Sequence, residues 1–160
     1  MAETITITVH NKNEKYSQLI PQLTALVIGE PDSTANFANC IAALKEVFDW
    51  LWVGIYFVKK NNSGIEQMVL GPFQGPVACT RIDLGRGVCG KSWERAETII
   101  VDDVDQFPGH IACSSLSKSE IVVPLIRDGK VFGVLDIDSD QLSSFNQIDK
   151  HQLEILVSYL

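Results

Sequence analysis

Residues 119–139, SEIVVPLIRDGKVFGVLDIDS, contain the pattern that decides the fold. Two apolar, β-branched runs, Ile121 to Ile126 and Lys130 to Ile137, each predict a β-strand. They are joined by Arg127-Asp128-Gly129, and an Asp-Gly pair between two such runs is a strong signal for a hairpin turn. The segment therefore predicts an antiparallel β-hairpin.

Carboxylates occupy one face at the end of this hairpin. Side-chain alternation along the second run predicts one face that contains Phe132, Val134, Asp136 and Asp138. The two aspartates would then lie about 7 Å apart, with Glu120 on the corresponding face of the first run. If this face lines a pocket, crowding raises the carboxyl pKa values and keeps one group protonated near neutral pH. The alternative is that the aspartates are exposed at the strand end and cap the following turn.

Another pair of strands and a terminal helix complete the predicted sheet layer. Trp52 to Val58 is β-branched and aromatic, and Met68 to Leu70 is expected to form a shorter partner strand. Alternation places Trp52 and Tyr56 on the same face of the longer strand. A terminal helix is predicted to begin near Ser144, with Gln147 completing a capping box.

Two helices are predicted before the first strand. Apolar residues recur at helical spacing from Tyr16 to Val27, where Pro21 is expected to kink or interrupt the helix. The second helix is expected to start after Asp32, and Cys40 lies on its apolar stripe, which favours an inert core thiol. Helices that bracket a mostly antiparallel sheet make the fold class α+β.

Size, composition and charge exclude several classes of protein. The chain of 160 residues is expected to be a single domain over residues 1–160, with residues 1–13 a flexible lead or Thr4 to Val9 an extra edge strand. A content of 46% hydrophobic residues is too high for a disordered chain. A net charge of −7 argues against nucleic acid or an anionic membrane as partner. Without a membrane-length apolar run or a basic N-terminal start, the expected location is cytoplasmic.

Four cysteines, Cys40, Cys79, Cys89 and Cys113, are then the unusual feature of the composition. Their spacing contains no C-x-x-C pair, so no zinc site and no cofactor are predicted. Three of them fall between Gly71 and Ser119, a segment with little regular pattern, and long segments of that kind are often binding loops. Cys89 precedes a short predicted helix, Lys91 to Arg95.

The sequence resembles the free methionine-(R)-sulfoxide reductases, which are stand-alone GAF-domain enzymes, over roughly residues 14–158. The resemblance rests on WVGIY at 52–56, GPFQG at 71–75, ACTRI at 78–82, GVCG at 87–90, FPGHIAC at 107–113, SEIVVPL at 119–125 and GVLDIDS at 133–139. It implies a GAF-like six-stranded antiparallel sheet, with helices on one side and a loop-covered small-molecule pocket on the other. It also implies reduction of the R epimer of free L-methionine sulfoxide, with thioredoxin as the recycling reductant, and a homodimer.

The same resemblance implies roles for the cysteines. Cys113 is expected to be the nucleophile that attacks the sulfoxide sulfur and becomes a sulfenic acid. Cys79 is expected to resolve this sulfenic acid as a disulfide. Cys89 corresponds to a third family cysteine that also pairs with Cys113.

The pocket residues follow from the same motifs. Glu120, Asp136 and Asp138 match the acidic residues that bind the sulfoxide oxygen and the amino-acid head. Trp52 and Tyr56 match the aromatic side chains that enclose the methyl-sulfinyl end. A protonated carboxyl such as Glu120 or Asp138 would act as general acid, because the sulfoxide oxygen is a poor leaving group until it is protonated.

Two other functions remain open from the sequence. The first is a non-catalytic GAF module that binds a small ligand and signals to a partner, although such a module has no need of three loop thiols. The second is a metal site built from Cys79, Cys89, Cys113 and His110, for which the sequence spacing is poor.

Overall fold

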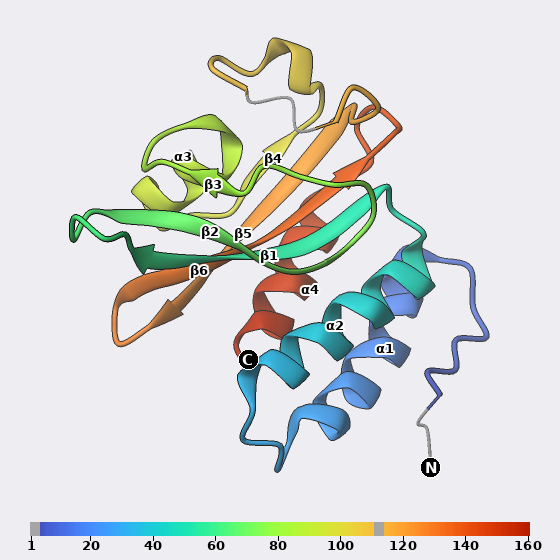
Figure 1. Cartoon of the computed structure of the whole chain (residues 1–160). Coiled ribbons are helices and arrows are strands. Elements are labelled where there is room, and N and C mark those ends of the chain that lie inside the picture. The colour runs from blue at the N-terminus through green and yellow to red at the C-terminus, as the bar shows by residue number, and fades with distance from the viewer. Residues whose placement is uncertain (1–3, 111–113) are drawn as a thin grey trace.

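One six-stranded antiparallel sheet organises the protein, and its strand order is β3-β2-β1-β6-β5-β4. The computed structural model describes residues 4–110 and 114–160. The expected α+β class and six-stranded sheet are confirmed (Figure 1). The strands are β1 (Trp52–Lys60), β2 (Glu66–Gln74), β3 (Arg81–Ile82), β4 (Ile99–Val101), β5 (Ser119–Arg127) and β6 (Lys130–Ser139).

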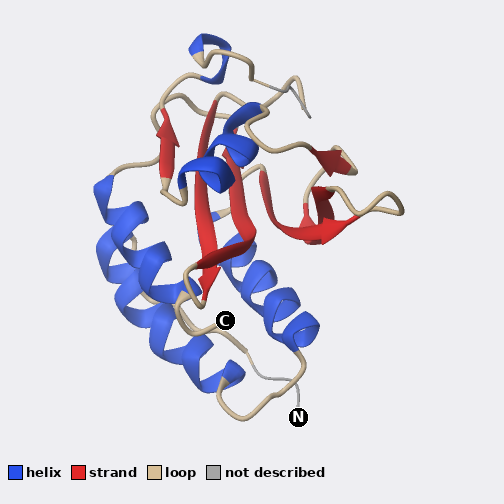
Figure 2. Ribbon diagram, turned by 90° about the vertical axis from the view of Figure 1, so that its left-hand side faces the viewer, coloured by secondary structure: helices blue, strands red, loops and turns tan. Residues whose placement is uncertain are grey.

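Helices lie on both faces of this sheet. Three of them, α1 (Lys12–Val27), α2 (Ser33–Phe48) and α4 (Gln147–Val157), pack on one face and form the larger core with it. The short helix α3 (Gly87–Arg95) packs on the opposite face (Figure 2), where a smaller core lies. A 3₁₀ turn, Val104–Gln106, also lies on that side. The expectation of helices on one side only is therefore wrong for α3.

The predicted β5–β6 hairpin is confirmed and has the turn that its sequence demands. Asp128 and Gly129 have φ values of 51° and 74°, and two positive φ values are the requirement of a type I′ turn. At the other end of the hairpin, Glu120 is paired with Asp138. The turn and the carboxylates thus lie at opposite ends of the two strands.

A β-bulge in β6 corrects the predicted faces of this strand. Leu125 pairs with Gly133, but the next residue, Ile126, pairs with Val131, so Phe132 is an extra residue. The bulge reverses the alternation at this point. Phe132 packs with the helical core and Val131 with the core beneath α3, the reverse of the prediction.

Strand β1 separates the two cores as its alternation predicts. Val53 and Ile55 belong to the helical core, whereas Trp52 and Tyr56 belong to the core beneath α3. Gly54 lies between the two aromatic residues, and a Cβ at this position would come within 2.2 Å of the Trp52 ring. Only glycine leaves room for the indole to lie flat along the strand.

The predicted helix boundaries need two corrections. Helix α1 continues through Pro21 without interruption. Helix α4 begins at Gln147 rather than near Ser144, because Asn146 is the N-cap and forms a capping box with Asp149. The Ser144 hydroxyl instead lies 2.7 Å from that of Ser139.

The segment between Gly71 and Ser119 contains more regular structure than its sequence predicts. Strand β2 continues to Gln74, and α3 begins at Gly87, so that Cys89 lies in its first turn. Strands β3 and β4 also fall in this segment.

Residues 4–10 do not form the predicted edge strand, and residues 1–3 lie outside the described residues. Residues 4–10 have no regular secondary structure, and Ile5 and Ile7 pack against the helical core. The amide of Thr6 donates to the Gln22 side chain at 2.9 Å, which ties the segment to α1. Within the described ranges, no helix has the length and apolar character that a membrane crossing requires.

The buried carboxylate of Asp149 joins α4 to α1. It is fully buried and accepts from the Tyr16 hydroxyl at 2.9 Å and from the Lys12 ammonium at 2.7 Å. It also accepts from the Asn146 amide at 2.8 Å, which closes the capping box. One side chain therefore satisfies donors from two helices.

We predict that Asp149→Ala lowers the free energy of unfolding by about 2–4 kcal/mol, because it leaves a buried hydroxyl and an ammonium without their acceptor. Urea denaturation measures this change. The matched control is Glu46→Ala, an exposed acid on α2, which should change stability by less than about 0.5 kcal/mol. Equal effects of the two substitutions would contradict the role given to Asp149.

Candidate functional site

Three carboxyl groups lie together on the sheet face that α3 covers. Glu120 comes from β5, and Asp136 and Asp138 come from β6, where the strand pairing sets Glu120 opposite Asp138. Glu120 is 5% exposed and Asp136 is 7% exposed. The prediction that this face is buried is confirmed, and the alternative of exposed turn-capping aspartates is wrong. We call these three residues the carboxyl cluster.

Helix α3 brings a thiol onto the carboxyl cluster. Cys89 is buried in its first turn, and its Sγ lies 4.0 Å from Glu120 Oε1. Helix α3 packs closely against the loop that precedes it because position 90 is glycine. A Cβ there would come within 2.5 Å of the Asp83 carbonyl oxygen. The thiol and the acids therefore come from separate parts of the chain and meet through the packing of α3 on the sheet.

Two further side chains contact the carboxyl cluster. The Ser117 hydroxyl donates to Asp138 Oδ1 at 2.5 Å, and His110 Nε2 lies 3.7 Å from Glu120 Oε2. Asp136 Oδ1 is buried and has no hydrogen-bond partner in the part of the chain that the structure describes. Ser117 was missed by the sequence analysis, because a serine in a polar loop gives no signal of its own.

Burial and crowding favour the neutral form of the cluster. Burial is the main cause that raises the pKa of Glu120 well above its usual range, and the charges of Asp136 and Asp138 add to it. Burial and the charge of Asp138 likewise raise the pKa of Asp136. Burial raises the pKa of Asp138 to about 6, although the Ser117 hydroxyl opposes this change. The raised pKa values therefore favour the protonated forms of Glu120 and Asp136 near neutral pH, whereas Asp138, with a pKa of about 6, is the most readily ionised of the three.

The cysteines differ sharply in their surroundings. Cys40 is a free thiol in the helical core, where burial raises its pKa to about 12, so its prediction as a core residue is confirmed. Cys89 is also free and buried, and its pKa is raised by burial and by the neighbouring acids. Cys79 is disulfide-bonded. Cys113, predicted as the nucleophile, lies outside the described residues.

Two aromatic side chains form a wall beside the carboxyl cluster. The ring centroids of Trp52 and Tyr56 lie 6.0 Å apart on β1. Trp52 Nε1 donates to the Pro76 carbonyl at 3.0 Å, and the Tyr56 hydroxyl donates to the Cys79 carbonyl at 2.9 Å. These bonds hold the connection that contains Cys79 against the wall.

Two small cavities adjoin the cluster, and Asp136 and Asp138 line both of them. The first, of about 30 Å³, is also lined by Cys89, Glu120 and His110. The second, of about 20 Å³, is lined by Trp52 and Tyr56 among others. The predicted acidic and aromatic pocket residues therefore lie together. Asp136 and Asp138 lie between the cavity lined by Cys89 and the cavity lined by Trp52 and Tyr56.

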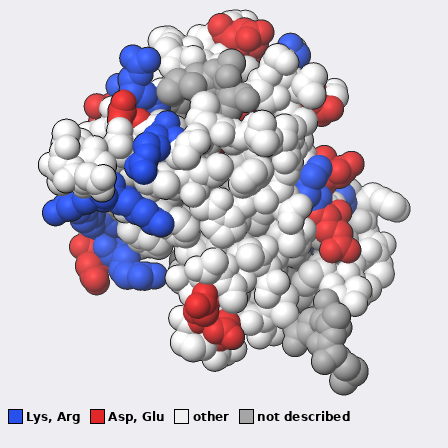
Figure 3. Space-filling view, in the orientation of Figure 1, with Lys and Arg blue, Asp and Glu red and all other residues white. Residues whose placement is uncertain are grey.

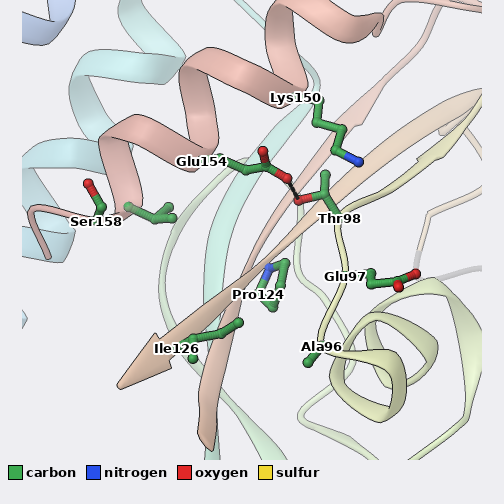
Figure 4. Close-up of a pocket in the computed structure, with 9 residues that line it drawn as sticks. Ala96, Glu97, Thr98, Pro124, Ile126, Lys150, Glu154 and Ser158 are labelled. Carbon is green, nitrogen blue, oxygen red and sulfur yellow. Dashed lines mark hydrogen bonds between the residues drawn. The ribbon is translucent and has the colours of Figure 1, made fainter. Parts of the chain in front are cut away.

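A larger hollow lies elsewhere and contains none of the predicted site residues. It has a volume of about 550 Å³ between β5, the loop after α3 and helix α4, and the Thr98 hydroxyl donates to Glu154 across it at 2.6 Å (Figure 4). Basic side chains gather in another place, near the ends of the β1–β2 and β5–β6 hairpins (Figure 3). Glu120 and Asp136, whose pKa values are raised well above the usual range, lie in neither of these places. They identify the carboxyl cluster as the candidate site.

The donor atoms that come near one another differ from the predicted metal set. Among the described residues, Cys89, Glu120 and Asp136 each offer an atom within 4.8 Å of the others and could together hold a cation. The predicted set of Cys79, Cys89, Cys113 and His110 includes no carboxylate.

The raised pKa values predict an unusual dependence of stability on pH. An acid whose pKa is raised on folding keeps its proton in the native state after the unfolded chain has lost it. The free energy of unfolding therefore falls as pH rises above about 4. For Asp138, whose pKa rises from 3.8 to about 6, this loss is on the order of 2–3 kcal/mol by pH 7.

Urea unfolding at pH 4.5 and pH 7.5 tests this prediction. Asp138→Asn should lose less stability between these pH values than the unmodified protein, whereas Asp140→Asn, an exposed neighbour on the same segment, should not differ from it. An unchanged pH dependence in Asp138→Asn would show that Asp138 is not the titrating group.

Comparison with known proteins identifies the family of the chain. The GAF domain family model matches residues 35–160. GAF domain-containing protein A of Dictyostelium discoideum is 54% identical over 100% of this chain and 99% of its own length. The free methionine-R-sulfoxide reductase of Escherichia coli is 43% identical over 94% of this chain and 88% of its own.

A solved structure gives the same result in three dimensions. The X-ray structure of the free methionine-R-sulfoxide reductase from Neisseria meningitidis, in complex with its substrate, superposes with a TM-score of 0.94. It shares 48% identity and covers 98% of this chain and 92% of its own. The chain therefore belongs to the family of GAF domain proteins that includes the free methionine-R-sulfoxide reductases.

Proposed function

We propose that this protein reduces free L-methionine-(R)-sulfoxide to L-methionine. The observation that supports the proposal most directly is the carboxyl cluster: acids that hold protons at neutral pH lie between an aromatic wall and a cysteine-bearing helix. A sulfoxide needs a proton donor for its oxygen and a thiol for its sulfur, and the site offers both types of group. The membership of the chain in this family agrees with the chemistry.

The reaction is a thiol substitution at sulfur. Cys113, which the sequence motifs assign as nucleophile, attacks the sulfoxide sulfur while a protonated carboxyl of Glu120 or Asp136 donates to the oxygen. A bond forms between Cys113 Sγ and the substrate sulfur, and the protonated oxygen leaves as water. A water molecule then attacks Cys113 Sγ, the sulfur–sulfur bond breaks with its electron pair going to methionine, and Cys113 is left as a sulfenic acid. The substrate sulfur is reduced by two electrons and the cysteine is oxidised by two electrons.

A second thiol then restores the cysteine. The Cys79 thiol attacks the sulfenic acid of Cys113, which forms a disulfide and releases one water. Cys89 is the alternative resolving thiol, but its burial and raised pKa make it a weak nucleophile in this conformation. A dithiol reductant such as thioredoxin then returns both thiols by disulfide exchange.

The remaining site residues recognise the two ends of the substrate. Trp52 and Tyr56 offer a polarizable wall to the methyl-sulfinyl group. Asp138, predicted from the sequence as a second candidate for the general acid, has a pKa of about 6 and is better suited to bind the substrate ammonium as a carboxylate. An ammonium exists on a free amino acid but is absent from a methionine inside a peptide, so this contact selects the free form.

The cellular context proposed with this function is a cytoplasmic homodimer that uses thioredoxin as reductant. Free methionine sulfoxide forms where methionine meets oxidants, and the disulfide step requires a reducing compartment. A non-catalytic sensor that retains the ligand is the second candidate, and it predicts binding of the sulfoxide without turnover.

The direct test is incubation of the protein with the separate R and S epimers of free methionine sulfoxide and dithiothreitol, with methionine measured over time. We expect consumption of the R epimer only and loss of turnover in Cys113→Ser. Cys40→Ser, which removes the core thiol, is the matched control and should keep turnover. Consumption of neither epimer by folded, reduced protein would favour the sensor.

The proposed role of Glu120 as proton donor to the sulfoxide oxygen gives a second prediction. Glu120→Gln keeps the shape of the side chain but cannot donate an acidic proton, so kcat should fall by about 100-fold to 10,000-fold. The pH–rate profile should also lose its alkaline limb. Asp140→Asn should leave both quantities unchanged. A kcat within threefold of that of the unmodified protein would exclude Glu120 as the general acid.

A further inference from the structure

We propose that Cys89, Glu120 and Asp136 form a binding site for a thiophilic divalent cation, of which Zn²⁺ is the representative, and that occupation of the site blocks the reductase. These residues offer one thiol and two carboxyl groups as ligands. With the imidazole of His110 they form a combination of ligands that zinc accepts. The inhibitory part of the proposal rests on the proposed function, whereas the binding part does not.

The distances in the cluster are close to those of a tetrahedral site. One donor atom from each of the three residues lies within 4.8 Å of the others, and Cys89 Sγ is 4.0 Å from Glu120 Oε1. Zinc binds sulfur at about 2.3 Å and carboxylate oxygen at about 2.1 Å, which sets neighbouring donors about 3.5 Å apart. Side-chain rotations that shorten these separations by up to about 1.3 Å would therefore bring the donors to ligand distance.

An unsatisfied atom points to a missing ligand at the same place. Asp136 is 93% buried, and among the described residues its Oδ1 has no hydrogen-bond donor. A buried carboxylate oxygen without a partner is unfavourable, and a cation would supply the interaction that it lacks. The cavity of about 30 Å³ lined by Cys89, Glu120 and Asp136 leaves space beside this oxygen.

A fourth donor is within reach of the cluster. His110 Nε2 lies 3.7 Å from Glu120 Oε2, and imidazole nitrogen is a common zinc ligand. Zinc would replace the protons that the cluster otherwise holds: Cys89 and the carboxyls release their protons to water as the cation binds. No electron is transferred in this exchange.

Occupation of the site would stop the proposed reaction at its proton step. A carboxyl that binds zinc has no proton to donate to the sulfoxide oxygen. The cation would also lie beside Asp136, which lines both small cavities. Zinc is therefore expected to act as a reversible inhibitor that a chelator removes.

The binding test uses Co²⁺ as a spectroscopic probe for zinc, in a Cys79→Ser, Cys113→Ser background that leaves only Cys40 and Cys89 as thiols. Titration should give one equivalent of bound Co²⁺ and a thiolate-to-cobalt charge-transfer band, and added Zn²⁺ should abolish this band. Cys40→Ala in this background is the matched control and should keep the band, because Cys40 lies in the other core.

Two variants decide which residues bind the cation. Cys89→Ser should abolish the charge-transfer band. Asp136→Asn keeps the thiol but should weaken Co²⁺ binding at least tenfold, and circular dichroism checks that each variant is folded. An absence of saturable binding, a band that survives Cys89→Ser, or an unchanged affinity in Asp136→Asn would each overturn the proposal.

The inhibition test uses the chain with all four cysteines. Turnover of the R sulfoxide should fall with rising Zn²⁺ in proportion to occupancy of the site, and it should return when a chelator is added. If zinc inhibits the full chain but Co²⁺ does not bind to the Cys79→Ser, Cys113→Ser variant, the inhibition would be assigned to Cys79 or Cys113. That result would overturn the proposal. Absence of turnover before zinc is added would count against the proposed reductase, whereas the binding test would stand.

Discussion

The crowding of three carboxyl groups in one buried place is the constraint on which the rest of the structure depends. Glu120 and Asp138 face each other across neighbouring strands, and Asp136 lies on the same side of β6. Burial and the proximity of like charges raise the pKa values of Glu120 and Asp136 and so favour their protonated forms. The strand pairing that brings the three carboxyl groups together therefore also raises their pKa values.

The division of the molecule into two cores explains how it tolerates such a cluster. The helical core beneath α1, α2 and α4 is almost wholly apolar, and its buried acid, Asp149, has three donors. The smaller core beneath α3 contains the carboxyl cluster, a buried thiol and an unpartnered oxygen. Stability comes mainly from the first core, which leaves the second free to hold groups that reduce stability but perform chemistry.

Much of this arrangement could be predicted from local sequence. The Asp-Gly turn identifies the β5–β6 hairpin, and the alternation along β1 places Trp52 and Tyr56 together, because both features depend only on neighbouring residues. The burial of Asp136 also followed from its strand position. The roles of the cysteines came from the resemblance to a family, since a thiol in a loop gives no chemical signal by itself.

The parts that could not be predicted depend on distant contacts. The bulge at Phe132 reverses the predicted faces of Val131 and Phe132 at the start of β6. An alternating sequence does not reveal where one extra residue is inserted. Helix α3 starts earlier than its sequence indicates because Gly87 and Gly90 let it begin and pack against the preceding loop. The contact of Ser117 with Asp138 and the unpartnered Asp136 oxygen likewise appear only after the sheet has formed.

The central claim is that the carboxyl cluster holds protons at neutral pH, and infrared difference spectroscopy of the folded protein measures this directly. We expect a carbonyl band of protonated carboxylic acid that persists at pH 7.5 and is diminished in both Glu120→Gln and Asp136→Asn. A spectrum at pH 7.5 with only carboxylate bands, in a protein shown to be folded, would show that the cluster holds no proton.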